Sequence, residues 1–347
     1  MRRPQLIYAS NFRQFGRGTF VVSNTLRRLP GFDVRPIHAT GGMMRGPLRM
    51  PAALLAGHLL ATRFPDALIL GDSARGSEIA WRISRCRRRE FALRFGGIWS
   101  KDRPVDEFAR ALGAAQLVIV PSNASRKSLE QQGSRRKDQM IVIIPNGVET
   151  QVDAVPLPNI EAPLGLFAIG QVYALKQPEL AISTLAEIVA AGRDATLSFF
   201  GAGDPTPYLM KARQRGLEER VRFLGLVERP WEQLPENPVL LHMSRREGFG
   251  LAVAEGLVRG VPTYVLEGSG GPEELVRFTG GGQVCEPRAA SIAGHILSDL
   301  AEPRQLGTRL KASMSLAREE YSTEKMLARY QRVLTEQIDT RGRGKRS

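Results

Sequence analysis

Short apolar runs alternate with amphipathic stretches along most of the chain. Residues 6–9, 66–70 and 117–121 are runs of this kind, and stretches with helical spacing, such as residues 78–89, separate them. A short, continuous run rich in β-branched residues is typical of a strand that is buried on both faces. Strands of this kind that alternate with helices predict an α/β fold with a parallel sheet covered by helices on both faces.

The same pattern begins again after a polar, Pro-rich segment at residues 150–163. Further strands are predicted at residues 166–169 and 195–200, and the last predicted helix starts near residue 323. We therefore expect two doubly wound, Rossmann-like domains in tandem, which bind ligands at the carboxyl ends of their strands. The predicted parts are residues 1–155, residues 160–320, a C-terminal helix at residues 321–338 and a disordered basic tail at residues 339–347.

Residues 244–255 form the stretch with the clearest chemistry. Gly248 and Gly250 make a Gly-x-Gly turn between a predicted strand and a helix, with Glu247 before the turn and Glu255 inside the helix. Free N–H groups at a helix start attract phosphate, and glycine lets a ligand approach the backbone. Carboxylates accept hydrogen bonds from hydroxyls. A nucleotide sugar offers both kinds of group; the alternative is an acidic helix start that only complements the helix dipole.

Length and composition favour a globular protein that does not span a membrane. The chain has 347 residues, of which 42% are hydrophobic, and no run approaches the ~18 apolar residues of a membrane helix. The N-terminal apolar stretch is too short for a signal peptide. Cys86 and Cys285 lie far apart and match no metal spacing. We therefore expect a reduced, cytoplasmic protein.

The positive charge is concentrated in the first half of the chain. Residues 1–155 hold 25 Lys and Arg against 12 Asp and Glu, a net of +13, which leaves 24 against 23, a net of +1, for the remainder. Such asymmetry indicates an anionic partner, either nucleic acid, an acidic membrane surface or a phosphorylated substrate. The candidate contact patch is Arg85, Arg87, Arg88 and Arg89; the alternative is a solvated helix face. Because no nucleic-acid-binding motif accompanies the charge, we do not expect a nucleic-acid partner.

Several motifs, in the right order, resemble the retaining glycosyltransferases of family 4, also called glycosyl transferases group 1. The similarity covers nearly the whole chain and is strongest in the second half. It rests on Gly170 with Lys176, residues 197–203, residues 221–227, residues 244–255, residues 260–262 and residues 270–273, and in the first half on residues 120–122 and 144–148.

The resemblance implies the GT-B fold, in which two Rossmann-like domains face each other across a cleft and the C-terminal helix crosses back to the first domain. It also implies transfer of a hexose, with retention, from a nucleotide sugar to a glycan or lipid-linked acceptor in cell-envelope or polysaccharide synthesis. We expect a UDP- or GDP-linked donor as substrate and no cofactor. The basic first domain suggests an anionic acceptor at the inner face of the plasma membrane, to which the protein would bind peripherally.

The resemblance also implies roles for particular residues. Glu247 would bind hydroxyls of the donor sugar, Lys176 would neutralise the leaving diphosphate, and Glu255 would bind the ribose. Lysine is a compact point charge suited to that role. The other donor-binding positions are the backbone N–H groups of Phe249, Gly250 and Leu251, together with Gly170, Gln171, Gly201 and Val227, and with Gly16 and Gly18 from the first domain.

No Asp-x-Asp motif occurs in the chain. Metal-dependent glycosyltransferases of the other common fold use such a pair as ligands. We therefore predict metal-independent transfer, in which Lys176 and helix dipoles replace the cation.

Two positions depart from the family pattern. Gln171 stands where the family has arginine, and Arg245 and Arg246 are the candidates to replace that charge. No histidine follows residues 93–97, where the family often has one. The remaining acceptor-side candidates are His38, Asp72 and Arg94. These departures keep a non-catalytic nucleotide-sugar-binding protein open as an alternative. A GT-B nucleotide-sugar epimerase, which shares the fold but seldom has two glutamates at this spacing, is the other alternative.

Overall fold

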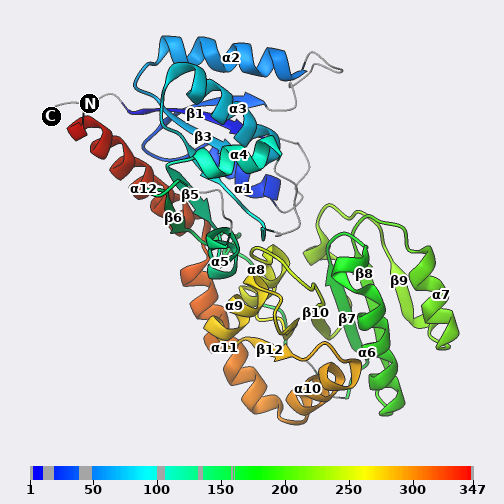
Figure 1. The fold of residues 1–347 in the computed structure, drawn as a ribbon. Helices are drawn as coiled ribbons and strands as arrows, with labels where there is room; N and C mark the ends of the chain where they lie inside the picture. Colours follow the sequence, from blue (N-terminus) through cyan, green and yellow to red (C-terminus); the bar gives the residue numbers. More distant parts are fainter. Residues whose placement is uncertain are drawn as a thin grey trace. The chain divides into compact units, whose positions relative to one another are not determined.

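The computed structural model of the chain describes residues 3–10, 19–38, 49–99, 106–131, 136–157, 159 and 161–344 (Figure 1). They form two compact units, Met1–Gly147 together with Thr323–Ser347, and Val148–Ser322. Each unit contains a six-stranded sheet with helices between the strands. The predicted α/β fold with two doubly wound domains is therefore confirmed.

The sheet of the first unit is parallel throughout. Its order is β2 (Asp33–His38), β1 (Gln5–Ser10), β3 (Leu68–Asp72), β4 (Ala92–Arg94), β5 (Leu117–Val120) and β6 (Met140–Ile143). The helices of this unit are α1 (Thr19–Leu26), α2 (Arg49–Arg63), α3 (Ser73–Arg87), α4 (Glu107–Ala114), α5 (Asn123–Glu130) and α12 (Thr323–Gly344).

Alternate residues of the central strands supply two cores in this unit. Ile7 and Ala9 of β1 pack in one cluster with residues of α2 to α5, whereas Leu6 and Tyr8 pack in another with residues of α1 and α12. The two-residue period of a strand explains this division, because successive side chains point to opposite faces. The central strands are therefore apolar throughout, as the sequence pattern predicts.

The last helix, α12, packs within the first unit although the second unit precedes it in the chain. Met326, Tyr330 and Leu334, spaced four residues apart, are buried in the core that α12 shares with α1. The predicted end of this helix at residue 338 is wrong, because α12 continues to Gly344. Ile338 still packs against that core, and each further residue adds one hydrogen bond to an existing helix. Of the predicted disordered tail, only residues 345–347 lie outside the described residues.

The second unit also has a parallel sheet. Its order is β12 (Gly282–Cys285), β11 (Thr263–Leu266), β10 (Pro238–His242), β7 (Leu164–Ile169), β8 (Ala195–Phe200) and β9 (Val221–Phe223). Its helices are η1 (Ala174–Lys176), α6 (Pro178–Ala190), α7 (Thr206–Gln214), η2 (Glu218–Arg220), η3 (Pro230–Glu232), α8 (Leu251–Leu257), α9 (Gly271–Thr279), α10 (Ala289–Ala301) and α11 (Pro303–Glu320). Strand β12 is not predicted from the sequence, because only two of its four residues are apolar.

The strand order reverses between β7 and β10. β7 comes first in the unit, and its neighbours are β8 on one side and β10 on the other. Loops that leave the carboxyl ends of such a strand pair diverge to opposite faces of the sheet, and the crevice between them is the usual ligand site of a doubly wound fold. The segments after Ile169 and after His242 therefore meet at this switch point.

The segment between the units belongs to the second unit rather than forming a free linker. The backbone N–H of Val155 donates to the carbonyl of Arg259 at 2.8 Å, and Arg318 Nη2 donates to the carbonyl of Val152 at 2.7 Å. The units accordingly divide between Gly147 and Val148, whereas the sequence pattern places the boundary at residues 155–160.

Candidate functional site

The loop after β7 carries Gly170 and Lys176. Gly170 has φ +146°, a conformation that glycine adopts readily, and a Cβ built on it would lie 3.6 Å from Lys176 Cε. Gly201, after β8, packs on the same loop, since a Cβ there would come within 1.7 Å of the Gly170 carbonyl oxygen. Only glycine therefore fits at residue 201. The short distance between Gly170 and Lys176 shows that the Lys176 side chain lies against the loop after β7, at the switch point.

Glu247, five residues after the end of β10, is the centre of a charged cluster. Its Oε2 accepts a hydrogen bond from Lys176 Nζ at 2.5 Å and lies 2.8 Å from His242 Nε2. Its backbone is held as well, because the N–H of Glu247 donates to the Ser269 carbonyl and the N–H of Gly271 donates to the Glu247 carbonyl. The loop after β11 thus holds the backbone of Glu247, and Lys176 in the loop after β7 forms the ion pair with its carboxylate.

The charges of this cluster keep Glu247 ionised. Burial alone would raise the pKa of Glu247, but the neighbouring His242 and Lys176 outweigh burial and hold the pKa well below its ordinary value. The side chains of Lys176 and Glu247 nevertheless remain 21% and 28% exposed. A lysine beside an ionised, accessible carboxylate can bind an anionic group and hydroxyl groups of one ligand.

Glu255, on α8, has a different environment. It is half-buried, and its Oε2 accepts a hydrogen bond from Trp231 Nε1 at 2.8 Å. Burial raises the pKa of Glu255, even though the Trp231 hydrogen bond and the charge of Arg259 act in the opposite direction. The two glutamates predicted to act together therefore have opposite pKa shifts and separate partners.

Other predicted positions lie around these two carboxylates. Within the described residues, the backbone N–H groups of Phe249, Gly250 and Leu251 donate to no other group, which leaves them for a ligand. Helix α8 has seven residues, begins at Leu251 directly after Gly250 and contains Glu255, as the sequence pattern predicts. Val227 packs in the hydrophobic cluster that includes Trp231, and Gln171 is exposed. Gly16 and Gly18 lie outside the described residues.

Asp72 and Arg94, predicted as acceptor-side candidates, form a structural ion pair inside the first unit. Arg94 Nη1 donates to Asp72 Oδ1 at 3.1 Å, and the two side chains are 1% and 2% exposed. Tyr8 and Ser23 donate their hydroxyls to Asp72 Oδ2, and Arg94 Nη2 donates to Asn146 Oδ1. Neither side chain is accessible to an acceptor. His38 is the last residue of β2, and burial lowers its pKa, followed by the charge of Arg27.

Two residues of the site are not predicted from the sequence. His242 ends the apolar run of β10, and a polar residue at a strand's carboxyl end, five residues before Glu247, is a signal that could have found it. Trp231 lies in a Pro-rich connection without periodicity, and its position carries no comparable signal. Each contacts one of the two predicted glutamates.

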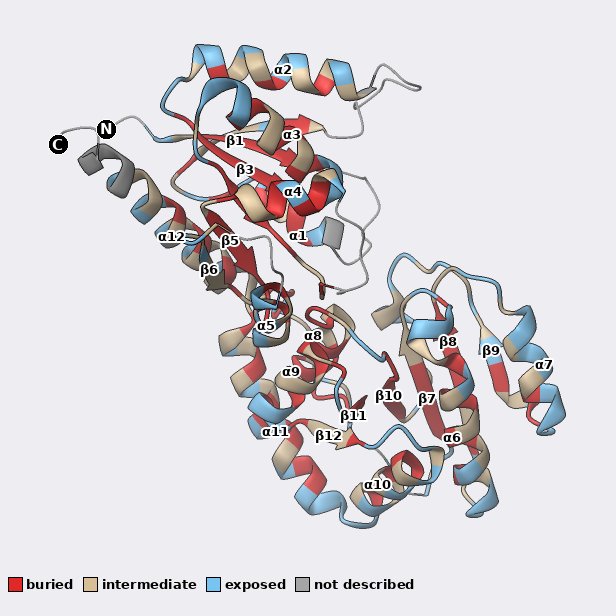
Figure 2. Ribbon diagram, viewed as in Figure 1, coloured by how far each residue is buried: buried red, intermediate tan, exposed pale blue. Residues whose placement is uncertain are grey.

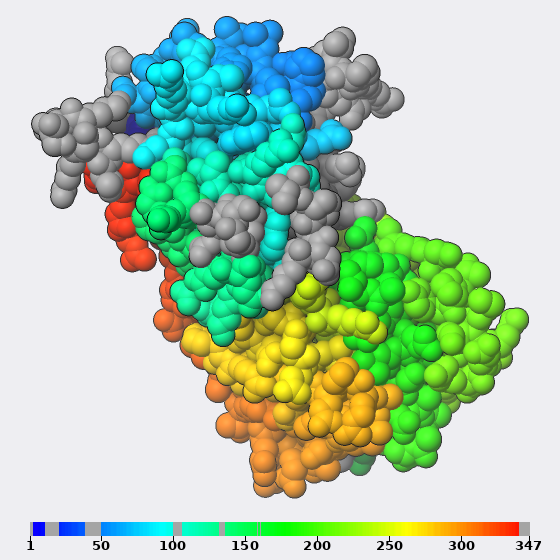
Figure 3. Space-filling model, in the orientation of Figure 1, coloured from blue at the N-terminus to red at the C-terminus, as the bar shows by residue number. Residues whose placement is uncertain are grey.

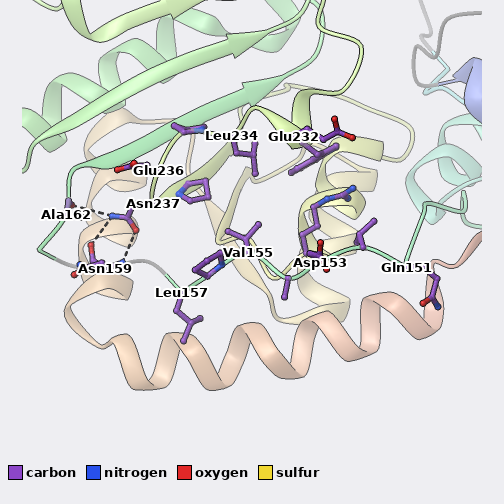
Figure 4. A pocket seen from close by; sticks show the side chains of 17 residues that line it. Gln151, Asp153, Val155, Leu157, Asn159, Ala162, Glu232, Leu234, Glu236 and Asn237 are labelled. Atoms are coloured by element: carbon purple, nitrogen blue, oxygen red, sulfur yellow. Dashed lines mark hydrogen bonds between the residues drawn. The ribbon is translucent and has the colours of Figure 1, made fainter.

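A cavity of about 820 Å³ lies elsewhere in the second unit, near the amino end of β10 (Figure 4). Its walls are residues 151–157, Asn159 and Ala162 of the connecting segment, together with Trp231, Glu232, residues 234–238 and Arg259. Asn237 closes one side, donating from Nδ2 to the Asn159 carbonyl and accepting the Asn159 N–H, both at 2.9 Å. Lys176 and Glu247 do not line this cavity, which is therefore distinct from the charged cluster.

In the parts of the chain that the structure describes, no three His, Cys, Asp or Glu side chains gather in a way that could hold a metal ion. The same described parts contain no helix with the length and apolar character needed to cross a bilayer.

Comparisons with known proteins agree with this geometry. Residues 156–314, which contain the Lys176, Glu247 and Glu255 positions, match the family model of glycosyl transferases group 1. N-acetyl-alpha-D-glucosaminyl L-malate synthase of Bacillus anthracis is 28% identical over 173 residues. That match spans 48% of this chain and 44% of the length of the relative.

Three solved structures are similar over almost the whole chain. Anabaena HepE in complex with UDP-glucose has a TM-score of 0.76 at 18% identity and covers 96% of this chain and 99% of its own. Sucrose-phosphate synthase from Thermosynechococcus elongatus has a TM-score of 0.77 at 17% identity, with 97% and 100% covered. The lipopolysaccharide outer core galactosyltransferase WaaB, in its apo form, has a TM-score of 0.72 at 15% identity, with 96% and 99% covered.

The two parallel six-stranded sheets and their helices thus define a protein with the fold of the GT-B glycosyltransferases. Within that fold, residues 156–314 are the part that is similar to the glycosyl transferases group 1 family.

Proposed function

We propose that the protein is a glycosyltransferase that binds a nucleotide-sugar donor at the switch point of its second unit. The observation that carries this proposal is the contact of Lys176 Nζ with Glu247 Oε2, at the carboxyl ends of β7 and β10. In this proposal the lysine binds the diphosphate and the adjacent carboxylate accepts hydrogen bonds from sugar hydroxyls. The match of residues 156–314 and the binding of UDP-glucose by HepE support the same class of ligand.

In this proposal the chemistry depends on stabilising the leaving group. Departure of the nucleoside diphosphate increases negative charge on its phosphates while the sugar becomes oxocarbenium-like. Lys176 and the N–H groups of Phe249, Gly250 and Leu251 would stabilise that charge, and Glu247 would orient the sugar. We propose transfer with retention and without a metal ion, in which the acceptor attacks on the face that the leaving group vacates.

Arg245 is our candidate for the charge that Gln171 does not provide. Its backbone N–H donates to the carbonyl of Leu175 at 2.9 Å, which places it beside the turn that carries Lys176. The Arg245 side chain is exposed, and within the described residues it forms no ion pair. A guanidinium in this position can bind a phosphate in a bidentate manner, which favours an active transferase over a donor-binding protein without activity.

A thermal-shift screen in EDTA tests donor binding. UDP-, GDP-, ADP- and dTDP-sugars are compared on the wild type, on Lys176→Met and on Lys211→Met, a control whose exposed Lys211–Glu179 pair lies in the same unit. We expect one nucleotide class, with UDP or GDP as the base, to raise the melting temperature of the wild type and the control. Lys176→Met should respond much less. No shift of the wild type with any donor would refute the proposal.

Turnover distinguishes the alternatives. A transferase releases nucleoside diphosphate when an acceptor is present, an epimerase converts the sugar nucleotide without any acceptor, and a non-catalytic binder does neither. Anion-exchange chromatography of the nucleotides after incubation separates these three outcomes. We expect release of nucleoside diphosphate that depends on the acceptor.

For the acceptor, we propose a lipid-linked anionic glycan at the inner face of the plasma membrane, as in cell-envelope synthesis. Leu55 and Leu59, one turn apart on α2, are 62% and 63% exposed. Figure 2 shows the outer face of α2 as largely exposed, and α2 and α3 form adjoining surface in Figure 3. Leucines exposed in this way are typical of helices that contact lipid.

The end of α3 contacts the helix that carries this leucine pair. Arg87 Nη2 donates to Thr62 Oγ1 at 2.6 Å, which joins the end of α3 to α2, and Arg85 and Arg88 are exposed. Arg89 of the predicted patch is instead half-buried and bonded to carbonyls of residues 61, 64 and 67, so it serves the fold. The lipid-facing surface we propose therefore consists of Leu55, Leu59, Arg85, Arg87 and Arg88.

Vesicle flotation at low salt tests this surface. The wild type should float with phosphatidylglycerol vesicles and not with pure phosphatidylcholine vesicles, and salt should weaken binding. Leu55→Ser combined with Leu59→Ser should abolish flotation, whereas Leu209→Ser, at an exposed leucine of the second unit, should not. Flotation of the double variant equal to that of the wild type would exclude this surface.

A further inference from the structure

The Glu255 carboxylate is held by the indole of Trp231. Trp231 Nε1 donates to Glu255 Oε2 at 2.8 Å from η3, the only helical turn in the connection between β9 and β10. The indole itself is fixed by two further contacts. The Phe167 ring meets it edge-on, with ring centroids 5.8 Å apart at 90°, and the Arg259 guanidinium lies 4.7 Å from its centroid.

Within the described residues, the Glu255 carboxylate forms no ion pair, although the charge of Arg259 acts on it from a distance. Arg259, one turn further along the chain, donates from Nη1 to the backbone carbonyl of Glu255 at 2.9 Å and stacks on Trp231 instead of binding the carboxylate. Glu255 Oε1 makes no hydrogen bond with any residue that the structure describes. A half-buried carboxylate with one neutral donor reduces stability, so the fold gains little from keeping it.

The cavity explains why the indole depends on these contacts. Trp231 and Arg259 both line it, together with Val155 and Leu157 of the connecting segment (Figure 4). One side of the indole therefore borders open space, and Phe167 and Arg259 determine where its N–H points.

We propose that Trp231 is a positioning residue for the nucleoside part of the donor. Its N–H fixes one oxygen of Glu255, so that the other oxygen is held to accept a hydrogen bond from a ribose hydroxyl. A neutral donor suits this task, because it orients the carboxylate without an opposing charge that would weaken it as an acceptor. The inference rests on the proposed function, since it requires a nucleotide to bind in the second unit.

Ribose discrimination tests the inference. Calorimetry compares the nucleoside diphosphate that binds the wild type with its 2′-deoxy and 3′-deoxy analogues, on the wild type, Trp231→Phe and Glu255→Gln. The wild type should prefer the ribose form over at least one analogue by about ten- to a hundredfold, as for a hydrogen bond to a charged group. Trp231→Phe should lose most of that preference, as Glu255→Gln does, while its affinity for the deoxy analogue stays within about twofold of the wild-type value.

A second variant covers the case in which Trp231→Phe does not fold. Arg259→Met removes the stacking on Trp231 but keeps both the indole N–H and the Glu255 side chain, and it should lower the preference for ribose by an intermediate factor. The inference is overturned if both variants keep the wild-type preference, if they weaken the ribose and deoxy forms equally, or if the wild type shows no preference. If no nucleoside diphosphate binds the wild type, the proposed function itself fails.

Discussion

Each unit has a pair of oppositely charged side chains near the carboxyl ends of its central strands. The two pairs differ in how far their side chains are exposed and can contact a ligand. In the first unit, Asp72 and Arg94 are 1% and 2% exposed. In the second unit, Lys176 and Glu247 are 21% and 28% exposed. Residue type and position in the fold are thus similar, whereas accessibility differs by an order of magnitude.

The number of protein partners explains this difference. Asp72 accepts hydrogen bonds from Tyr8, Ser23, Ser73 and Arg94, so its oxygens are saturated by the protein. Lys176 has three N–H donors, and within the described residues it donates only one hydrogen bond, to Glu247. A saturated buried pair contributes to the fold, and an unsaturated accessible pair can bind a ligand. The number of hydrogen-bond donors and acceptors that remain unused therefore distinguishes ligand-binding residues at strand ends from structural ones.

The largest effect that this comparison predicts is on stability. Asp72→Ala leaves Arg94 buried without its charge partner, which should lower the free energy of unfolding by about 3–5 kcal/mol. Asp33→Ala is the matched control, because its pair with Arg35 is exposed in the same unit and should contribute at most about 1 kcal/mol. Urea denaturation measures both. Equal losses in the two variants would mean that burial does not distinguish these pairs.

The next effect is on activity. Lys176→Met should lower kcat/KM by about a hundredfold or more, because the charge that stabilises the leaving diphosphate is lost. Its melting temperature should stay within a few degrees of the wild-type value, since the pair is partly exposed. Steady-state kinetics with the donor identified by the screen measures the first effect. If Lys176→Met has the same kcat/KM as the control Lys211→Met, Lys176 does not take part in the transfer reaction.

A smaller effect is expected at His242, which contacts Glu247 from the end of β10. His242→Ala removes one of the two side chains that hold the Glu247 carboxylate and should lower kcat/KM by about tenfold. His242→Gln keeps an N–H donor and should recover part of that loss. Binding of the free nucleoside diphosphate should change little in either variant, because Lys176 remains. A stability loss without any kinetic change would make His242 a packing residue.

The fold was largely predictable from the sequence because buried parallel strands are continuous apolar runs. Strand β8 has the predicted bounds of residues 195–200, and the Gly turns after β7 and β8 lie where the pattern places them. Strand β12 was missed because Gly282 and Gln283 contribute no apolar signal, and its place depends on pairing with β11. Such strands are defined by their neighbours rather than by their own residues.

The candidate site was predictable only in part, for a related reason. Motif spacing leads to Lys176, Glu247 and Glu255, since each follows a recognisable strand and turn. It does not lead to Trp231, because its hydrogen bond to Glu255 joins residues 24 positions apart through an irregular connection. Nor does it show that Asp72 is saturated, because its partners come from β1, α1 and β4.

The smallest predicted effects are changes of opposite sign in the pH dependence of stability. The lowered pKa of Glu247 adds stability above its unfolded value of 4.5, and this is lost as pH falls through the folded pKa. The raised pKa of Glu255 adds stability below 4.5, and this is lost as pH rises through the folded pKa. At pH 7, Glu247→Gln should therefore lower the melting temperature by a few degrees, and Glu255→Gln should raise it by about 1–3 °C. Melting curves are measured from pH 4 to 8. As the pH decreases, the lowering of the melting temperature in Glu247→Gln should shrink, and the rise in Glu255→Gln should disappear. Changes of the same sign in both variants would contradict the assignment of one carboxylate to an ion pair and of the other to a buried site without an ion pair.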